Sequence, residues 1–227
     1  MHWNDYGFLL SKEKYSENAI SCEIFTKDHG KVSGIIYGGT SRKNKNYLQI
    51  GNLLHINYSS KNESRLGSIK SEIFKVISPL FFDNEKKLLC LRSSINLIKT
   101  LTVESQINEK IYFLIEKLFL ILSNDLWFSN YIFWELEFFK LIGYNLEFKN
   151  LVKEEIVDNK KIYFVLSNQQ KKLIPNFLVE NNFNEINKES LLSALKLNSD
   201  YLDKTILKPN NIPTPKSRND LINLIKK

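Results

Sequence analysis

The chain has 227 residues, 43% of them hydrophobic, and a formal charge of +7. This length allows one large or two small domains, and the apolar content is too high for a disordered chain. The excess of cations favours polyanionic partners such as nucleic acid, although a positive charge that serves only solubility would give the same total.

Residues 3–78 have the pattern of short strands. Five apolar runs are separated by turn residues, and five strands in a domain of this size match an OB-fold barrel. The runs are Phe8–Leu10, Ile20–Thr26, Lys31–Tyr37, Leu53–Tyr58 and Gly67–Ile77. Asp28-His29-Gly30 between two of the runs predicts a hairpin turn, because Gly30 is able to take a positive φ.

The period of the apolar residues changes to that of helices after Asn84. The spacing predicts helices over Lys86–Thr100, Ile111–Leu122 and Trp127–Ile142, and the last is apolar almost all round, as in a buried helix. Ile162–Leu166 then predicts a strand that turns into a second strand. The predicted helix that begins near Ser190 ends before Pro209, and a short helix covers Asn219–Ile225.

Cations gather at two places in the chain. Gly38-Gly39 is followed by Arg42, Lys43 and Lys45, which we expect on a loop, and residues 1–78 hold 11 Lys and Arg against 7 Asp and Glu. Residues 204–227 hold six Lys and Arg against Asp220. Cations that follow a backbone, together with aromatic faces for bases, are typical of single-strand binding. The alternative is that the cations of the loop and of the C-terminal region are only solvated and bind no partner.

Patterns typical of catalysis or metal binding are absent from the sequence. It contains no GxSxG, P-loop, GxGxxG or HExxH motif, and its three histidines have no carboxylate or cysteine at metal-ligand spacing. Cys22 and Cys90 form no CxxC pair, and we expect both to be reduced and buried. The sequence therefore predicts a protein that is not an enzyme and has no metal or cofactor.

The sequence also predicts no membrane segment. The most apolar stretch is short and contains Glu116 and Lys117. Asp5 lies in an N-terminal region without the longer apolar segment of a signal peptide. We expect a cytoplasmic protein.

Several short motifs, taken in order, resemble the RecO family of bacterial DNA repair proteins. The opening Trp3-Asn4-Asp5-Tyr6-Gly7-Phe8-Leu9-Leu10-Ser11 is similar to the family's W-x-D-x-G start, and His29-Gly30-Lys31 to its H-G-R turn. The later segments that resemble family motifs are Gly38-Gly39-Thr40-Ser41-Arg42, Leu48-Gln49-Ile50-Gly51-Asn52, Trp134-Glu135-Leu136, Leu141-Ile142-Gly143-Tyr144 and Ile212-Pro213-Thr214-Pro215-Lys216-Ser217-Arg218. The resemblance extends over nearly the whole chain.

This resemblance implies an α+β fold of three parts. An N-terminal OB-fold β-barrel would occupy residues 1–78, followed by a helical domain in residues 79–147, which residues 186–227 continue. A small third lobe with a β-hairpin would occupy residues 148–185. Many relatives bind zinc there through four cysteines, which this lobe lacks, so we expect a zinc-ribbon remnant without metal.

The resemblance also implies a DNA repair and recombination mediator, associated with the nucleoid. Such a protein binds single- and double-stranded DNA, anneals complementary strands, and acts with RecR to load RecA on DNA coated by single-stranded DNA-binding protein (SSB). The residues expected at DNA are Lys31, Arg42, Lys43, Lys45, Arg65, Lys216 and Arg218. Those expected at the acidic SSB C-terminal tail are Lys117, Trp134, Phe138 and Lys140, with Phe133 where relatives often carry arginine.

Other functions fit the same residues. An RNA-binding OB-fold protein would differ in its preference between RNA and DNA strands of equal length. A non-catalytic protein scaffold would not show the salt-dependent binding that phosphate contacts give. The third alternative is an enzyme of an unfamiliar kind, against which the missing acid–base residues argue.

Overall fold

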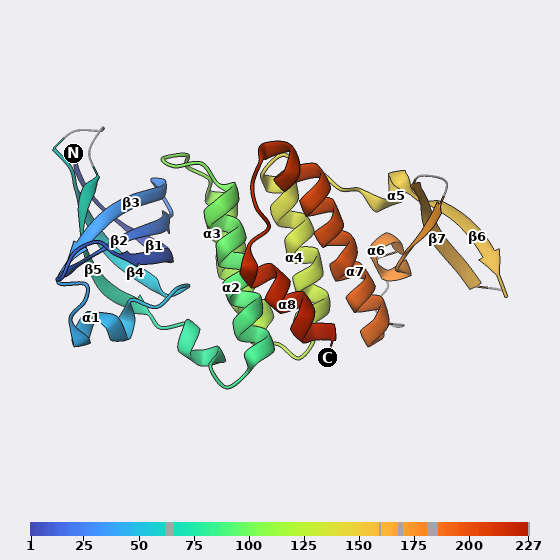
Figure 1. Cartoon of the computed structure of the whole chain (residues 1–227), viewed down its shortest axis with the longest axis horizontal. Helices are drawn as coiled ribbons and strands as arrows, with labels where there is room; N and C mark the ends of the chain where they lie inside the picture. Colours follow the sequence, from blue (N-terminus) through green and yellow to red (C-terminus); the bar gives the residue numbers. More distant parts are fainter. Residues whose placement is uncertain (62–65, 159, 168–169, 181–185, 227) are drawn as a thin grey trace. The chain divides into compact units, whose positions relative to one another are not determined.

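The computed structural model describes residues 1–61, 66–158, 160–167, 170–180 and 186–226. Of residues 149, 167 and 170 it describes the backbone only. The chain forms two compact units. The first comprises Met1–Ser123 and Pro215–Leu221, and the second comprises Asn124–Thr214 and Ile222–Lys227. Figure 1 shows a barrel in blue and teal, helices in green, yellow and red, and a small sheet in yellow to orange.

A closed five-stranded barrel opens the chain. Its strand order is β1-β2-β3-β5-β4, with β3 and β5 parallel and the other neighbours antiparallel. The strands are β1 (His2–Lys14), β2 (Ala19–Thr26), β3 (Gly30–Tyr37), β4 (Leu53–Ser59) and β5 (Gly67–Lys75). Alternate residues such as Leu9, Ile24 and Leu54 fill the barrel with 0% exposure. The predicted α+β fold with an N-terminal OB-fold barrel is confirmed.

Two helices of the first unit belong with the barrel. After a short 3₁₀ turn η1 (Ser78–Phe81), α2 (Glu85–Leu101) and α3 (Glu109–Leu122) follow in sequence. Lys31 of β3 donates from Nζ to the Lys99 carbonyl oxygen at 2.7 Å, and Lys99 pairs with Glu23 of β2 at 3.0 Å. Phe8 contacts the rings of two α3 residues, Tyr112 and Phe119.

These contacts explain why the compact units differ from the predicted domains. The sequence predicts a boundary near residue 78, where the strands end. The structure groups α2 and α3 with the barrel, because they bury its apolar outer residues and pair with its charged ones. The helical segments are therefore divided between the two units.

The second unit is built around α4 and α7. Their bounds, with those of its other helical segments, are α4 (Trp127–Leu141), α5 (Phe148–Leu151), α6 (Asn176–Glu180), α7 (Lys188–Tyr201), a π-helical turn η2 (Leu202–Leu207) and a 3₁₀ turn η3 (Lys208–Asn210). The fully buried Asn198 of α7 donates from Nδ2 to the Ile132 carbonyl oxygen at 3.1 Å and to the Glu135 carboxylate at 3.2 Å. This polar link fixes α7 on α4. The last helix, α8 (Lys216–Lys226), begins in the first unit and ends in the second.

The small lobe contains a three-stranded antiparallel sheet, where the sequence predicts a two-stranded hairpin. Its order is β6-β7-β8, with β6 (Lys153–Val157), β7 (Lys160–Ser167) and β8 (Gln170–Ile174). Phe164 is 7% exposed, and Lys171 of β8 lies over its ring at 4.7 Å while pairing with Glu155 of β6 at 2.5 Å. On this face, an aromatic side chain under an ion pair links all three strands.

Candidate nucleic-acid interface

The three cations after Gly38-Gly39 lie on a helix, and the predicted loop is wrong in this respect. α1 (Arg42–Tyr47) begins after Ser41, whose Oγ accepts from the Asn44 backbone N–H at 3.3 Å. Gly38 takes a φ of +73°, which turns the chain from β3 toward this helix. All three cations, Arg42, Lys43 and Lys45, remain exposed.

Four contacts hold the α1 segment on the barrel. Before the helix, Thr40 donates from Oγ1 to the Glu17 carbonyl oxygen at 3.0 Å; at its end, Tyr47 donates from Oη to the Ser71 carbonyl oxygen at 2.8 Å. Asn44 Nδ2 donates to the Gly38 carbonyl oxygen at 2.9 Å, and Lys12 Nζ donates to the Leu48 carbonyl oxygen. Leu48 itself is fully buried in the barrel core. The cations therefore project from a fixed ridge.

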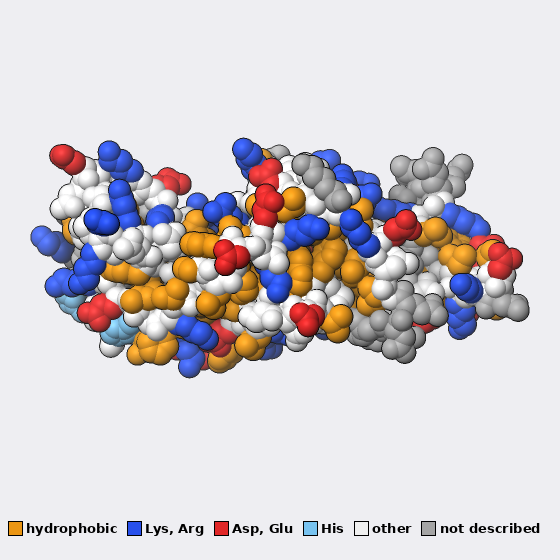
Figure 2. Space-filling model, turned by 90° about the horizontal axis from the view of Figure 1, so that it is seen from below, with side chains coloured by type: hydrophobic (Ala, Val, Ile, Leu, Met, Phe, Trp, Pro, Cys, Tyr) orange, Lys and Arg blue, Asp and Glu red, His pale blue; other side chains and the backbone are white. Residues whose placement is uncertain are grey.

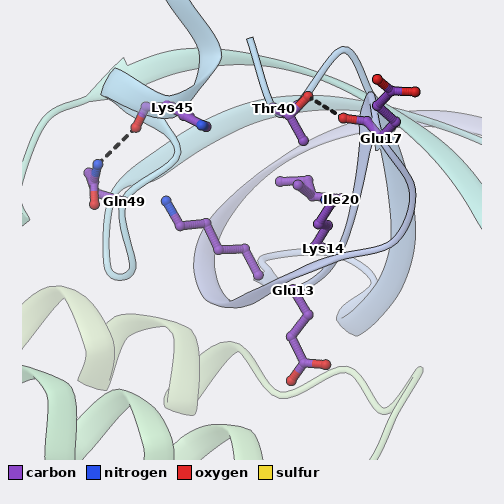
Figure 3. Close-up of a pocket in the computed structure, with 9 residues that line it drawn as sticks. Glu13, Lys14, Glu17, Ile20, Thr40, Lys45 and Gln49 are labelled. Carbon is purple, nitrogen blue, oxygen red and sulfur yellow. Dashed lines mark hydrogen bonds between the residues drawn. The ribbon is translucent and has the colours of Figure 1, made fainter. Parts of the chain in front are cut away.

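A groove lies between this ridge and the β1–β2 turn, and we call it the hairpin groove (Figure 3). Its volume is about 590 Å³, and it is lined by Lys12, Glu13, Lys14, Glu17, Ile20, Gly39, Thr40, Lys45 and Gln49. Burial, and then the charge of Lys45, lower the pKa of Lys12. An anion in this groove would offset the repulsion between these two ammonium groups.

A second groove lies between the ridge and β5, and we call it the β5 groove. Its volume is about 630 Å³, and it is lined by Ile36, Tyr37, Lys43, Asn44, Tyr47, Ser68, Ile69, Lys70, Ser71, Glu72 and Ile73. Tyr37, the last residue of β3, is 69% exposed. Lys43 and Lys70 are exposed as well.

Together, α1 and the two grooves carry a net positive charge. Six Lys and Arg stand against three Glu: Lys12, Lys14, Arg42, Lys43, Lys45 and Lys70 against Glu13, Glu17 and Glu72. Figure 2 shows several Lys and Arg side chains over the barrel part of the chain. The sequence analysis missed Lys12 and Lys14 as site residues, because they lie on β1 and only the barrel closure brings them beside α1.

Two of the cations predicted at DNA are withdrawn from solvent. Lys31 is 9% exposed, and its ammonium group donates a hydrogen bond to the Lys99 carbonyl oxygen. Arg218 of α8 is 0% exposed. Neither side chain is accessible to a phosphate, so we remove both from the site. Lys216 is exposed, and Arg65 lies outside the described residues.

The residues predicted to bind the SSB tail do not come together in one unit. Lys117 lies on α3 in the first unit, whereas Trp134, Phe138 and Lys140 lie on α4 in the second. Trp134 and Phe138 are 1% and 0% exposed and belong to the packed interior, so we remove them from the tail site. Lys117 and Lys140 are exposed.

Contacts within the first unit engage part of β2 and β3, the strands whose outer face holds oligonucleotides in OB-folds. Besides the contacts of Lys31 and Glu23 with Lys99, the Ser33 backbone N–H donates to the Glu104 carboxylate at 3.0 Å, and the Ser105 N–H donates to the Lys31 carbonyl oxygen at 2.8 Å.

Within the described ranges, no group of three or more His, Cys, Asp or Glu is placed to hold a metal. None of the helices in this part of the chain has the length and apolar composition needed to cross a membrane.

The strand order defines an OB-fold protein with a basic exterior at α1. Residues 1–77 match the family model described as recombination protein O N terminal. This match and the relatives described below show that the chain is similar to DNA repair proteins of the RecO family over nearly its whole length.

Three relatives described as DNA repair protein RecO illustrate the similarity. The protein of Rickettsia conorii is 28% identical over 92% of this chain and 93% of its own length, and that of Orientia tsutsugamushi is 28% identical over 94% of both. The protein of a Ruegeria species is 31% identical over 65% of this chain, and the match spans 61% of that relative, less than two thirds. A solved Entamoeba histolytica asparaginyl-tRNA synthetase is 12% identical over 95% of this chain and 60% of that chain, with a TM-score of 0.28, too low to indicate a shared fold.

Proposed function

We propose that this RecO-like protein binds single- and double-stranded DNA through the α1 ridge and its two grooves, and anneals complementary strands. The observation that carries the proposal is the fixed ridge itself: three exposed cations, Arg42, Lys43 and Lys45, on a short helix held to a rigid barrel. Cations held in place neutralise phosphates without a further cost of ordering the loop that carries them.

Annealing follows from electrostatics and needs no bond-making chemistry. Two complementary strands repel each other through their phosphates, and a protein that binds both lowers this repulsion and raises their local concentration. Further cations at Lys12, Lys14 and Lys70 extend the ridge on both sides. The protein therefore acts as a mediator and not as an enzyme.

The partners we propose are those implied by the family: RecR, the C-terminal tail of SSB and, indirectly, RecA. With RecR, the protein would help load RecA on SSB-coated strands. Lys117 and Lys140 are exposed cations suited to an acidic tail, each on its own unit. Binding of a labelled SSB-tail peptide to Lys117→Ala and Lys140→Ala variants identifies which unit carries that contact.

An annealing assay tests the proposed function. Complementary oligonucleotides, bare or coated with SSB, are mixed with the parent protein or with a variant that carries Ala at positions 42, 43 and 45. We expect the parent to accelerate duplex formation and the variant to lose most of that acceleration. A matched variant with Ala at the exposed Lys86, Lys110 and Lys196, outside the ridge and grooves, loses the same charge and should anneal like the parent. Equal annealing by both variants would remove α1 from the site.

A further inference from the structure

The usual oligonucleotide face of the barrel is partly occupied by other residues of this chain. β2 and β3 carry the contacts to Lys99, Glu104 and Ser105 described above, all within the first unit. Gly30 at the start of β3 is equally covered, because a Cβ there would lie 2.2 Å from the Gln106 carbonyl oxygen. A path for a strand that avoids these contacts lies on the other side of β3, beside α1.

The β5 groove offers an aromatic face beside cations. Tyr37 is 69% exposed at one wall, and the exposed ammonium groups of Lys43 and Lys70 belong to the same groove. Asn44 and Ser68 add polar side chains to its lining. Aromatic faces that stack on bases, together with cations along the backbone, are the means by which proteins bind single strands with little regard to sequence.

The walls of this groove are held in place. The Tyr47–Ser71 hydrogen bond of 2.8 Å joins α1 to β5 across the groove, and the Asn44–Gly38 hydrogen bond of 2.9 Å fixes α1 to the turn that follows Tyr37. Tyr37 is paired with Ala19 in the β2–β3 ladder, so its backbone is part of the barrel. The aromatic face and the two cations thus keep their spacing before any ligand arrives.

We propose that a single DNA strand runs through the β5 groove, with a base stacked on Tyr37 and neighbouring phosphates at Lys43 and Lys70. This inference rests on the proposed DNA binding and adds the strand type and the path. In a duplex the faces of the bases are covered by their neighbours, so Tyr37 contributes to the binding of single strands and not of duplexes.

The binding of two strands that have the same phosphate charge, one with bases and one without, tests whether a base stacks on Tyr37. The probes are oligothymidylate and an abasic strand of the same length, and the proteins are the parent, Tyr37→Ala and Tyr37→Phe. The parent should prefer the thymidylate strand by about 5-fold or more, because that is the contribution of one stacked base. Tyr37→Phe should keep this preference and Tyr37→Ala should lose it, while duplex affinity stays the same in all three.

Tyr15→Ala is the matched control, because Tyr15 is 59% exposed in the β1–β2 turn and does not line the β5 groove. It should bind like the parent. A Tyr37→Ala variant that is folded by circular dichroism and still prefers thymidylate would overturn the inference, as would an equal loss in duplex binding. Either of these Tyr37→Ala outcomes leaves the proposed function intact if the variant with Ala at positions 42, 43 and 45 fails to anneal. A parent protein that binds neither single strands nor duplexes would refute both the inference and the proposed function. A preference for oligouridylate over oligothymidylate would overturn the assignment of DNA as the strand.

Discussion

At the scale of residues, the opening motif that resembles the RecO family shapes the barrel end. The buried Asp5 carboxylate accepts from the Asp28 backbone N–H at 2.9 Å and contacts His29 Nδ1 at 2.9 Å. The Trp3 ring stacks on His29, with ring centroids 3.8 Å apart, and on Tyr58, with centroids 4.6 Å apart. The motif is visible in the sequence, but these contacts show that Trp3 and Asp5 fix the β2–β3 turn against β1 and β4.

Lys31 and Lys43 illustrate the same distinction between structural and ligand-binding residues. Burial lowers the pKa of Lys31, and its ammonium group donates a hydrogen bond to the Lys99 carbonyl oxygen. We expect Lys31→Ala to lower the free energy of unfolding by about 2 kcal/mol, because a hydrogen bond to a charged group is lost. Lys43, which is exposed, should behave oppositely: Lys43→Ala weakens DNA binding and leaves stability unchanged.

Urea unfolding and DNA titration of both variants measure this pair of effects. A Lys31→Ala protein that is as stable as the parent but weaker in DNA binding would show that Lys31 contacts DNA after all. The comparison uses one residue type in one barrel, so differences in net charge do not enter.

At the scale of elements, long periodic segments are predictable from the sequence and short ones are not. The strands β2 to β5 and the helices α2, α3 and α4 lie within a few residues of their predicted bounds, because apolar spacing is maintained over many residues. β1 (His2–Lys14) extends well beyond the predicted run Phe8–Leu10, because its ends are polar. α1 has six residues and depends on the Ser41 cap and the Tyr47–Ser71 contact. β6 is exposed along its whole length, so it has no apolar alternation to reveal it.

The sheet of β6, β7 and β8 shows how the small lobe is held in the absence of cysteines. Phe164→Ala should destabilise this lobe by about 3 kcal/mol, because it removes a buried aromatic side chain. Lys171→Ala should cost about 1 kcal/mol or less, because the Lys171–Glu155 pair is half exposed. Amide hydrogen exchange of residues 153–174 measures both effects.

A chelator is the matched test of the same account. EDTA should leave the exchange rates of this sheet and the unfolding midpoint unchanged, since the described residues contain no cluster suited to a metal. A lobe that loosens on chelation, or that tolerates Phe164→Ala, would contradict this explanation of its stability.

At the scale of the whole molecule, the barrel, α2 and α3 belong to one compact unit, and contacts within this unit engage part of β2 and β3. These contacts join residues far apart in sequence, such as Lys31 with Lys99 and Ser33 with Glu104. Patterns in a single sequence report local periodicity and not such pairings. The OB-fold was therefore predictable, whereas the withdrawal of Lys31 and the two grooves beside α1 were not.

The salt dependence of single-strand binding tests the central claim most directly. The affinity of the parent and of the variant with Ala at positions 42, 43 and 45 is measured over a range of salt concentrations. Each lost phosphate contact reduces the slope of log affinity against log salt by about 0.7 for single strands, so the variant should show a slope smaller by about two. Parallel lines for the two proteins would show that Arg42, Lys43 and Lys45 do not contact phosphates and would contradict the account.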